Sequence, residues 1–305
     1  MIIITAPVHP SLLDTLHEKG YEVIYAPAID YDGLMKVVEQ AEGLIVSTRI
    51  EINQPLLQQA KSLKWIGRLG SGMELIDTAY AASKNIICVS SPEGNRNAVA
   101  EHVLGMLLSL MNHIHTSANQ VENGQWHRSS NRGTELRGKT VGIVGFGNTG
   151  SAVAKLLAGF DVQVLAYDKY KTGFGKEYVQ ESTWEAVLEQ ADVISFHVPL
   201  TAETTNIADA TFFNQLKQQP FLINAARGKV VHTPSLVEAL KTQRIRGAAL
   251  DVLENESIDS LTASQREAFD FLTQQPNVLM TPHIAGYSHE SFLLMGKILL
   301  EKLGI

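Results

Sequence analysis

Near the middle of this 305-residue chain, a glycine-rich turn joins an apolar run to an amphipathic stretch. The apolar run Thr140–Val144 predicts a buried strand, and it leads directly into the turn Gly145–Gly150. The spacing predicts a helix from the third glycine onward and then a second strand, Val162–Tyr167, that ends in Asp168. An acidic residue about 20 positions past such a turn, in this strand–turn–helix–strand context, is typical of a dinucleotide-binding fingerprint.

Each residue type in this fingerprint has a mechanical reason. Gly145 permits the tight turn, Gly147 lets the backbone approach a pyrophosphate, and Gly150 allows close packing of the helix on the strand. The helix N-terminus offers free N–H groups and positive dipole to the phosphates. Asp168 would accept hydrogen bonds from both ribose hydroxyls and repel a 2′-phosphate, which favours NAD over NADP. The lysines at 169 and 171 weaken this preference slightly.

Short β-branched runs alternate with amphipathic stretches on both sides of the fingerprint. This alternation predicts an α/β fold with parallel sheets covered on both faces and right-handed crossovers. A length of 305 residues allows roughly two domains, which we expect to be Rossmann-like or flavodoxin-like. Besides the two strands above, the predicted strands are Ile2–Thr5, Glu22–Tyr25, Gly43–Ser47, Trp65–Arg68, Ile86–Val89, Val193–His197, Phe221–Asn224, Gly247–Leu250 and Val278–Met280.

A long apolar stretch, Asn97–Met111, separates the two series of strands. It is apolar almost all round, so we expect a helix buried between domains or at a subunit contact. A polar stretch, 112–138, follows it, and the chain ends in an amphipathic helix, Glu290–Leu303. We therefore expect a discontinuous substrate domain, 1–96 with 287–305, and an inserted dinucleotide-binding domain, 97–286.

Composition excludes several other classes of protein. Hydrophobic residues make up 45% and charged residues 19%, the balance of a folded globular protein. A net charge of −7 gives no bulk attraction to nucleic acid or anionic lipid, so neither is an expected partner. The single cysteine, Cys88, excludes an intramolecular disulfide and two-cysteine metal motifs, and we expect no metal. No signal peptide or spanning segment is evident, which indicates a cytoplasmic protein.

Reactive side chains follow three predicted strands, where ligands of open parallel sheets bind. Arg227 can bind a carboxylate through its forked guanidinium, and His283 can exchange a proton when a carboxylate such as Glu256 orients it. Taken singly, these segments could be a surface turn, a solvated acidic loop and a capped turn. Together they fit hydride chemistry on a 2-hydroxy or 2-keto acid. Seven other histidines, His102 among them, are expected to be surface or helix-packing residues.

These residues resemble the D-isomer-specific 2-hydroxyacid dehydrogenases, and within that family the phosphoglycerate dehydrogenases. The resemblance covers nearly the whole chain, and its motifs are highly specific when taken together. They are Arg68–Asp77, Ala100–His102, the fingerprint, His197–Thr201, Asn224–Gly228, Leu250–Glu256 and Thr281–Gly286.

The resemblance implies two α/β domains with the cofactor in the cleft between them, and it implies a role for each reactive group. Arg227 would bind the substrate carboxylate and carbonyl, His283 would donate or remove the hydroxyl proton, and Glu256 would tune His283. Asn148 and Thr149 would cover the pyrophosphate of NAD, and the other residues expected at the cofactor are Val198, Ala225, Ala226, Asp251 and Gly286.

The substrate loops depart from the family pattern. Ser257 follows Glu256 where a proline is usual, and the loop at 70–75 reads Gly-Ser-Gly-Met-Glu-Leu. The backbone of Ser71 and Gly72 would hold the substrate carboxylate. An arginine is common in the loop after the third strand of phosphoglycerate enzymes, and Arg49 stands about two positions late for it. Candidate phosphate contacts are Arg49, Arg68, Arg96 and Arg132, each of which could equally be a surface ion-pair partner.

We therefore predict an NAD-dependent dehydrogenase that interconverts a D-2-hydroxy acid and its 2-keto acid. The preferred substrate is 3-phosphoglycerate, which would place the protein in serine biosynthesis. The alternatives are a glyoxylate/hydroxypyruvate reductase, a D-lactate-type dehydrogenase, and a non-catalytic NAD-sensing interaction protein. The resemblance also implies a homodimer built through Asn97–Met111. Because 22 residues follow His283, we expect no appended regulatory domain and no inhibition by serine.

Overall fold

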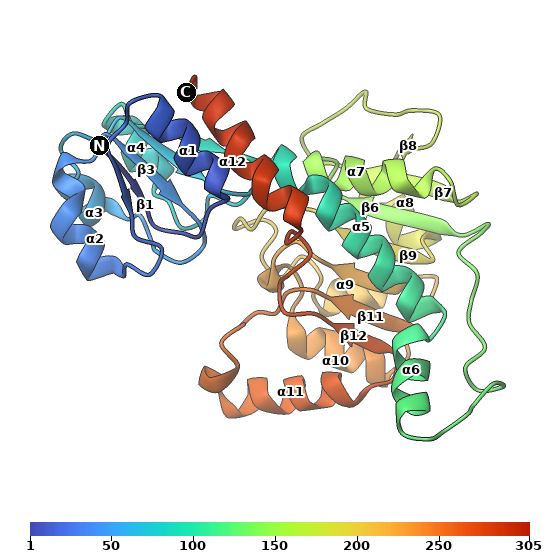
Figure 1. The fold of residues 1–305 in the computed structure, drawn as a ribbon. Helices are drawn as coiled ribbons and strands as arrows, with labels where there is room; N and C mark the ends of the chain where they lie inside the picture. Colours follow the sequence, from blue (N-terminus) through green and yellow to red (C-terminus); the bar gives the residue numbers. More distant parts are fainter. The chain divides into compact units, whose positions relative to one another are not determined.

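The computed structural model describes residues 1–305 and divides into two compact units (Figure 1). Unit 1 comprises Met1–Ala98 and Gly286–Ile305, and unit 2 comprises Val99–Ala285. Residues 97, 98 and 286, which the sequence assigned to the dinucleotide-binding domain, thus belong to unit 1. The first of these boundaries falls inside one continuous helix, α5 (Pro92–Met111), so no break in the chain marks it in the sequence.

Unit 1 is built on a five-stranded sheet of order β2-β1-β3-β4-β5, in which every pair is parallel. Alternate residues of β1 belong to different apolar cores. Ile3 is buried in the core that includes residues of α2, α3 and α4, whereas Ile2 and Ile4 are buried in the core that includes residues of α1 and α12. The elements are β1 (Ile2–Ile4), α1 (Pro10–Glu18), β2 (Val23–Tyr25), α2 (Tyr31–Val37), η1 (Val38–Gln40), β3 (Gly43–Val46), α3 (Gln54–Gln59), β4 (Trp65–Arg68), α4 (Thr78–Ser83), β5 (Ile87–Ser90) and α12 (His289–Leu303).

Unit 2 is built on a seven-stranded parallel sheet of order β12-β11-β10-β9-β6-β7-β8. The chain leaves β6 toward β7 and returns to β9 on the other side of β6, which creates a switch point where ligands of such sheets bind. The elements are α6 (Ile114–Glu122), β6 (Thr140–Val144), α7 (Asn148–Leu157), β7 (Gln163–Tyr167), β8 (Gln180–Glu181), α8 (Trp184–Gln190), β9 (Val193–Phe196), α9 (Ala210–Gln215), β10 (Phe221–Asn224), η2 (Gly228–Val230), α10 (Thr233–Lys241), β11 (Gly247–Leu250), η3 (Ile258–Ser260), α11 (Ala263–Gln274) and β12 (Val278–Met280).

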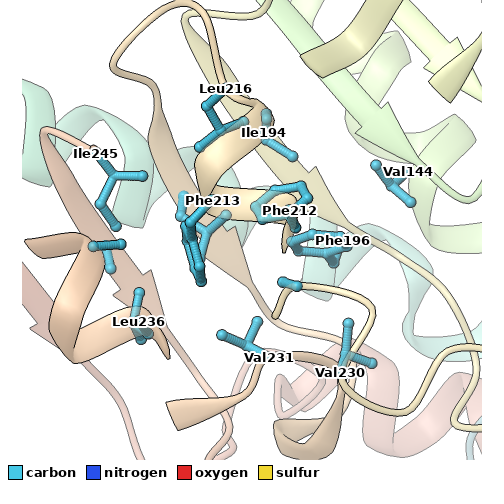
Figure 2. Packing of buried hydrophobic residues seen from close by; sticks show 14 of the residues in the cluster. Val144, Ile194, Phe196, Phe212, Phe213, Leu216, Val230, Val231, Leu236 and Ile245 are labelled. Atoms are coloured by element: carbon cyan, nitrogen blue, oxygen red, sulfur yellow. The ribbon is translucent and has the colours of Figure 1, made fainter. Parts of the chain in front are cut away.

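Both faces of the unit 2 sheet are covered by apolar cores. On one face Phe212 and Phe213 of α9 pack with Phe196 of β9, and the Phe196 and Phe212 ring centroids are 5.7 Å apart (Figure 2). On the other face, Val103 and Leu110 of α5 are buried with α7 and the central strands. Because both faces are buried, the strands are nearly continuous apolar runs, as expected for a parallel sheet.

The predicted fold class, α/β with two parallel-sheet domains, is confirmed. The long helix begins at Pro92 rather than Asn97, because proline is well suited to a first helical turn. The polar stretch after it contains α6, and the two-residue edge strand β8 was not predicted. Within the single chain α5 is not buried all round, since Glu101 and Gly105 are exposed, and burial at a subunit contact stays a prediction. None of the helices has the length and apolar character needed to cross a membrane.

Candidate active site

The glycine-rich turn of unit 2 connects β6 to α7. Gly145 has φ +95°, and a Cβ atom there would lie 2.6 Å from the backbone oxygen of His197. A Cβ on Gly150 would collide with the carbonyl oxygen of Gly145. A Cβ on Gly147 would meet nothing within 4 Å, and no side chain caps α7 at this residue. The first-turn N–H groups of α7 are therefore open to an anion, which fits a pyrophosphate.

Asp168, the residue after β7, lies beside this turn. Its Oδ2 accepts a hydrogen bond of 2.8 Å from the backbone N–H of Phe146, and its Oδ1 accepts one of 3.1 Å from that of Lys171. Lys171 Nζ donates to the Phe146 carbonyl (3.1 Å), and Lys169 forms an ion pair of 2.8 Å with Glu203. The hydrogen bond from Lys169 lowers the pKa of the Glu203 carboxyl. Both lysines near Asp168 thus have partners within unit 2.

Three polar segments follow the neighbouring strands β10, β11 and β12. Asn224 pairs with Leu250 and Leu250 with Met280, so the three strands end at the same level of the sheet. A Cβ on Gly228 would collide with the backbone of Leu253, which shows how closely the segment after β10 packs on the loop after β11. The topology thereby gathers the predicted catalytic groups at one edge of the sheet.

His283 and Glu256 form the most accessible polar pair at this edge. The His283 Nδ1 atom is 2.9 Å from Glu256 Oε2, and the two side chains are 40% and 46% exposed. With Nδ1 bound to the carboxylate, Nε2 remains the ring nitrogen that can exchange a proton with a ligand. The pair therefore has the arrangement of a general acid or base with its orienting carboxylate.

Arg227 is held at the same edge by a buried amide. Asn224, whose side chain is 1% exposed, donates from Nδ2 to the Arg227 carbonyl (2.9 Å) and accepts from the Ala226 N–H (3.1 Å). Arg227 NH1 donates to the Ala226 carbonyl (2.7 Å), and its side chain is partly buried. Asn224 fixes the backbone from which the guanidinium projects, a role that the sequence motif did not reveal.

Asp251, expected along the cofactor, is buried at the end of β11, and its place at the cofactor stays a prediction. Its side chain is 1% exposed, and its carboxylate accepts hydrogen bonds from the Thr281 hydroxyl (2.6 Å) and from the N–H groups of Ile284 (2.9 Å) and Ala285 (2.8 Å). A buried carboxylate needs such donors because its desolvation is costly. The Asp251 side chain is thus turned toward the segment that carries His283.

Sequence reasoning missed His102. This residue of α5 was expected to be a surface or helix-packing residue, and it packs on the segment before His283, with Nε2 3.0 Å from Thr281 Oγ1 and 3.6 Å from Asp251 Oδ1. A single polar ring among the apolar residues of α5 was the available signal. A contact between residues 179 positions apart requires the fold to be known.

His197, just after β9, was also not singled out as a functional residue. Its Nε2 is 2.8 Å from the hydroxyl of buried Ser195, whereas its Nδ1 is buried without a hydrogen-bond partner. Burial lowers the pKa of His197 from 6.5 to about 4, because desolvation disfavours the charged imidazolium. The ring is therefore neutral at pH 7.

The remaining residues expected at the cofactor lie in unit 2, except for Gly286. Asn148 and Thr149 open α7, and a Cβ on Gly145 would lie 2.9 Å from a methyl group of Val198. Ala225 and Ala226 form the turn above Asn224, and Ala226 is buried. Gly286 belongs to unit 1, where its carbonyl accepts a hydrogen bond of 2.8 Å from Ser291 at the start of α12.

The expected substrate residues of unit 1 follow β3 and β4. Arg68 is buried, its guanidinium donates to the Leu69 carbonyl, and a Cβ on Gly70 (φ +117°) would collide with it. Arg49 donates to the backbone carbonyls of residues 5, 27 and 29, so its guanidinium supports the loop that carries it. Ser71 is exposed and Gly72 partly exposed.

The parallel sheet with its open helix N-terminus defines unit 2 as a dinucleotide-binding domain. Residues 104–285 match the family model "D-isomer specific 2-hydroxyacid dehydrogenase, NAD binding domain". The chain belongs to this family. No group of three or more His, Cys, Asp or Glu side chains is arranged to hold a metal ion.

Similar proteins extend the match to nearly the whole chain. A D-3-phosphoglycerate dehydrogenase of Archaeoglobus fulgidus is 33% identical over 98% of this chain and 56% of its own length. A hydroxypyruvate reductase of Thermotoga maritima is 30% identical over 97% of this chain and 95% of its own length. The crystal structure of an Aquifex aeolicus D-lactate dehydrogenase complexed with NAD and lactic acid has a TM-score of 0.87 at 28% identity, covering 99% of this chain and 94% of that one. The chain spans 56% to 63% of the length of several phosphoglycerate dehydrogenases that it matches.

Proposed function

We propose that this protein is an NAD-dependent oxidoreductase that interconverts a D-2-hydroxy acid and its 2-keto acid, with 3-phosphoglycerate as the preferred hydroxy acid. The observation that carries the proposal is the His283–Glu256 pair, 2.9 Å apart, at the sheet edge where Arg227 also lies. Family membership and the uncapped start of α7 support NAD as the cofactor.

The residues of unit 2 divide the chemistry among them. NAD, when bound, supplies the hydride acceptor for oxidation at C2. His283 Nε2 takes the hydroxyl proton in oxidation and returns it in reduction, and Glu256 stabilises the imidazolium that forms. The Arg227 guanidinium binds the substrate carboxylate and polarises the neighbouring C2 oxygen. In unit 1, the backbone of Ser71 and Gly72 provides further hydrogen-bond donors for the carboxylate.

The acid itself has two candidates. The phosphoglycerate dehydrogenases among the relatives support a phosphorylated acid, with Arg68 and Arg49 as phosphate contacts. The hydroxypyruvate reductase of T. maritima, which this chain matches over 95% of its length, supports the unphosphorylated acid. The three backbone carbonyls that bind the Arg49 guanidinium also favour this second candidate, because they compete with a phosphate.

An assay of NADH oxidation with a panel of keto acids tests the proposal. Phosphohydroxypyruvate, hydroxypyruvate, glyoxylate and pyruvate would be compared at equal concentration. The highest kcat/KM is expected with phosphohydroxypyruvate, and a higher value with hydroxypyruvate would establish the second candidate. Binding of NADH without turnover of any acid would contradict an enzyme and favour an NAD-sensing protein.

His283→Ala tests the assigned proton-transfer residue. General acid–base catalysis typically contributes about 10²–10⁴-fold, so kcat should fall by about that factor while NADH binding stays intact. His127→Ala, which removes an exposed histidine of the same unit, is the matched control and should retain full activity. Unchanged turnover in His283→Ala would reject the assignment.

We also propose a homodimer built through α5. Ile114 and Val121 of the following helix α6 are exposed large apolar residues, 56% and 51% accessible, which supports a contact surface there. Sedimentation equilibrium should give twice the chain mass of 33.4 kDa. A monomeric mass would contradict this part of the proposal.

A further inference from the structure

His283 occupies a backbone conformation that other contacts must maintain. Its φ is +55°, in the left-handed region that non-glycine residues seldom adopt. The His283 N–H donates to the Asp251 carbonyl (2.7 Å) and to the Thr281 carbonyl (3.0 Å). Strained residues of this kind persist only where their surroundings determine them. The direction of the imidazole therefore depends on how the neighbouring backbone is held.

The buried carboxylate of Asp251 holds that backbone on both sides of His283. On the N-terminal side it accepts the Thr281 hydroxyl at 2.6 Å, and on the C-terminal side it accepts the N–H of Ile284 at 2.9 Å. Its second oxygen accepts the N–H of Ala285 at 2.8 Å. Loss of any one donor would leave a buried, charged oxygen less well satisfied.

Counting protons fixes the direction of the hydrogen bonds around Thr281. Its hydroxyl has one proton, and a carboxylate at 2.6 Å is a far stronger acceptor than the thioether of Met106 at 3.6 Å. The hydroxyl therefore donates to Asp251. Its oxygen then accepts from the third neighbour, His102 Nε2, at 3.0 Å. The proton of a neutral His102 ring thus lies on Nε2.

We propose that His102 and Thr281 are positioning residues that hold His283 for proton transfer by acting through Asp251. The inference rests on the proposed dehydrogenase function and adds two residues to its machinery. The hydrogen bonds run from His102 to Thr281 and from the Thr281 hydroxyl to the Asp251 carboxylate, which accepts the backbone N–H groups of the two residues after His283. Neither positioning residue needs to touch the substrate.

Paired substitutions separate the hydrogen bonds from the bulk of the side chains. Thr281→Val keeps nearly the same shape without the hydroxyl, whereas Thr281→Ser keeps the hydroxyl. His102→Leu removes the N–H donor, and His102→Gln retains one.

The loss of one charge-assisted hydrogen bond predicts a kcat about tenfold lower in Thr281→Val and His102→Leu. Thr281→Ser and His102→Gln should recover most of the wild-type kcat. The KM for the acid and the Kd for NADH should stay near wild type, whereas the Tm should fall in Thr281→Val, because the buried carboxylate loses one donor. Thr116→Val is the matched control, since it removes a threonine hydroxyl that donates to the Pro276 carbonyl at an exposed position.

A second readout does not depend on turnover. In protein labelled with ¹³C at histidine Cε1, the His283 signal is identified by its absence from His283→Ala. It should shift or broaden in Thr281→Val and coincide with wild type in Thr281→Ser. The inference is rejected if Thr281→Val leaves this signal and kcat unchanged, or if kcat falls only together with NADH affinity. If wild type reduces none of the acids, the proposed function fails, and the NMR comparison still decides whether Thr281 positions His283.

Discussion

The first strand of each unit is parallel and leads into a helix, yet the two helices start differently. In unit 1, β1 leads to α1, where Pro10 has no N–H and the Ser11 N–H donates to Nδ1 of His9 at 3.3 Å. In unit 2, β6 leads to α7, whose N-cap is Gly147 and has no side chain. The free N–H groups of the first turn are thus partly satisfied in α1 and left open in α7.

This difference separates the two helix starts in their capacity to bind an anion. A helix N-terminus binds phosphate when its N–H groups and dipole can reach the ligand. The side chain of His9 and the ring of Pro10 occupy that place in unit 1. In unit 2, a Cβ on Gly147 would face open space, so a ligand can approach the backbone. We therefore expect the first turn of α7, rather than the sheet, to bind the phosphates of the dinucleotide.

Gly147→Asp should cause the largest effect, because it gives α7 a side-chain cap. The φ of −87° at this position suits an N-cap aspartate, whose carboxylate would bind the N–H groups and repel a pyrophosphate. We expect NADH affinity to fall about 100-fold or more, and the free energy of unfolding to rise by about 0.5 kcal/mol. Fluorescence titration with NADH and urea unfolding would measure the two effects.

Two controls separate charge and position in this experiment. Gly147→Asn caps the helix without a charge and should lose less affinity than Gly147→Asp. Gly159→Asp adds the same charge at another open position of unit 2 and should bind NADH like wild type. Retained affinity in Gly147→Asp would show that the open helix start is not the phosphate site.

Acid should reveal a second difference, since unit 2 buries His197 beside the turn. The pKa of His197 is lowered to about 4 in the folded protein, whereas unfolded histidine titrates near 6.5. Between pH 6.5 and pH 4 the histidine is therefore protonated in the unfolded protein but neutral in the folded one. Protonation favours the unfolded state, so the free energy of unfolding falls as pH falls through this range. Between pH 7 and 5, wild type should lose about 2 kcal/mol more unfolding free energy than His197→Gln. Urea unfolding at both pH values tests this, and equal losses would contradict it.

The ends of the second strands differ as well. In unit 1, β2 is followed by Ala26 and Pro27, whereas in unit 2, β7 is followed by Asp168. Asp168→Ser removes the charge that would repel a 2′-phosphate, so the preference for NADH over NADPH should fall about tenfold, equivalent to about 1.4 kcal/mol. The ratio of the two kcat/KM values measures it. Asp270→Ser, at an exposed position of α11, is the control and should keep the wild-type ratio. An unchanged ratio in Asp168→Ser would show that other residues determine the preference for NADH over NADPH.

His9→Ala should give the smallest effect. Loss of the α1 cap is expected to cost about 1 kcal/mol of unfolding free energy, with no change in NADH affinity, because unit 1 lacks the phosphate turn. His17→Ala, on an exposed position of the same helix, should be nearly neutral. A marked loss of NADH affinity in His9→Ala would undermine the comparison between the two helix starts.

Much of the fold was predictable because its signals are local. Alternating apolar runs give parallel strands, and the fingerprint gives the turn before α7. Most predicted strands match the structure to within a residue at each end, for example Phe221–Asn224 and Gly247–Leu250. The helix α6 was missed because Ile114–Glu122 is largely polar and lacks a buried face.

The sequence by itself determined the fold class, the phosphate turn and the order of the reactive groups along the chain. It did not determine which way Asp251 faces, that Asn224 holds the turn before Arg227, or that His102 contacts Thr281. These contacts join residues on different strands and helices, and a residue at a strand end can turn toward solvent or into the protein. Only the tertiary structure decided between these directions, because burial makes each polar group find a partner among whatever the fold brings near it.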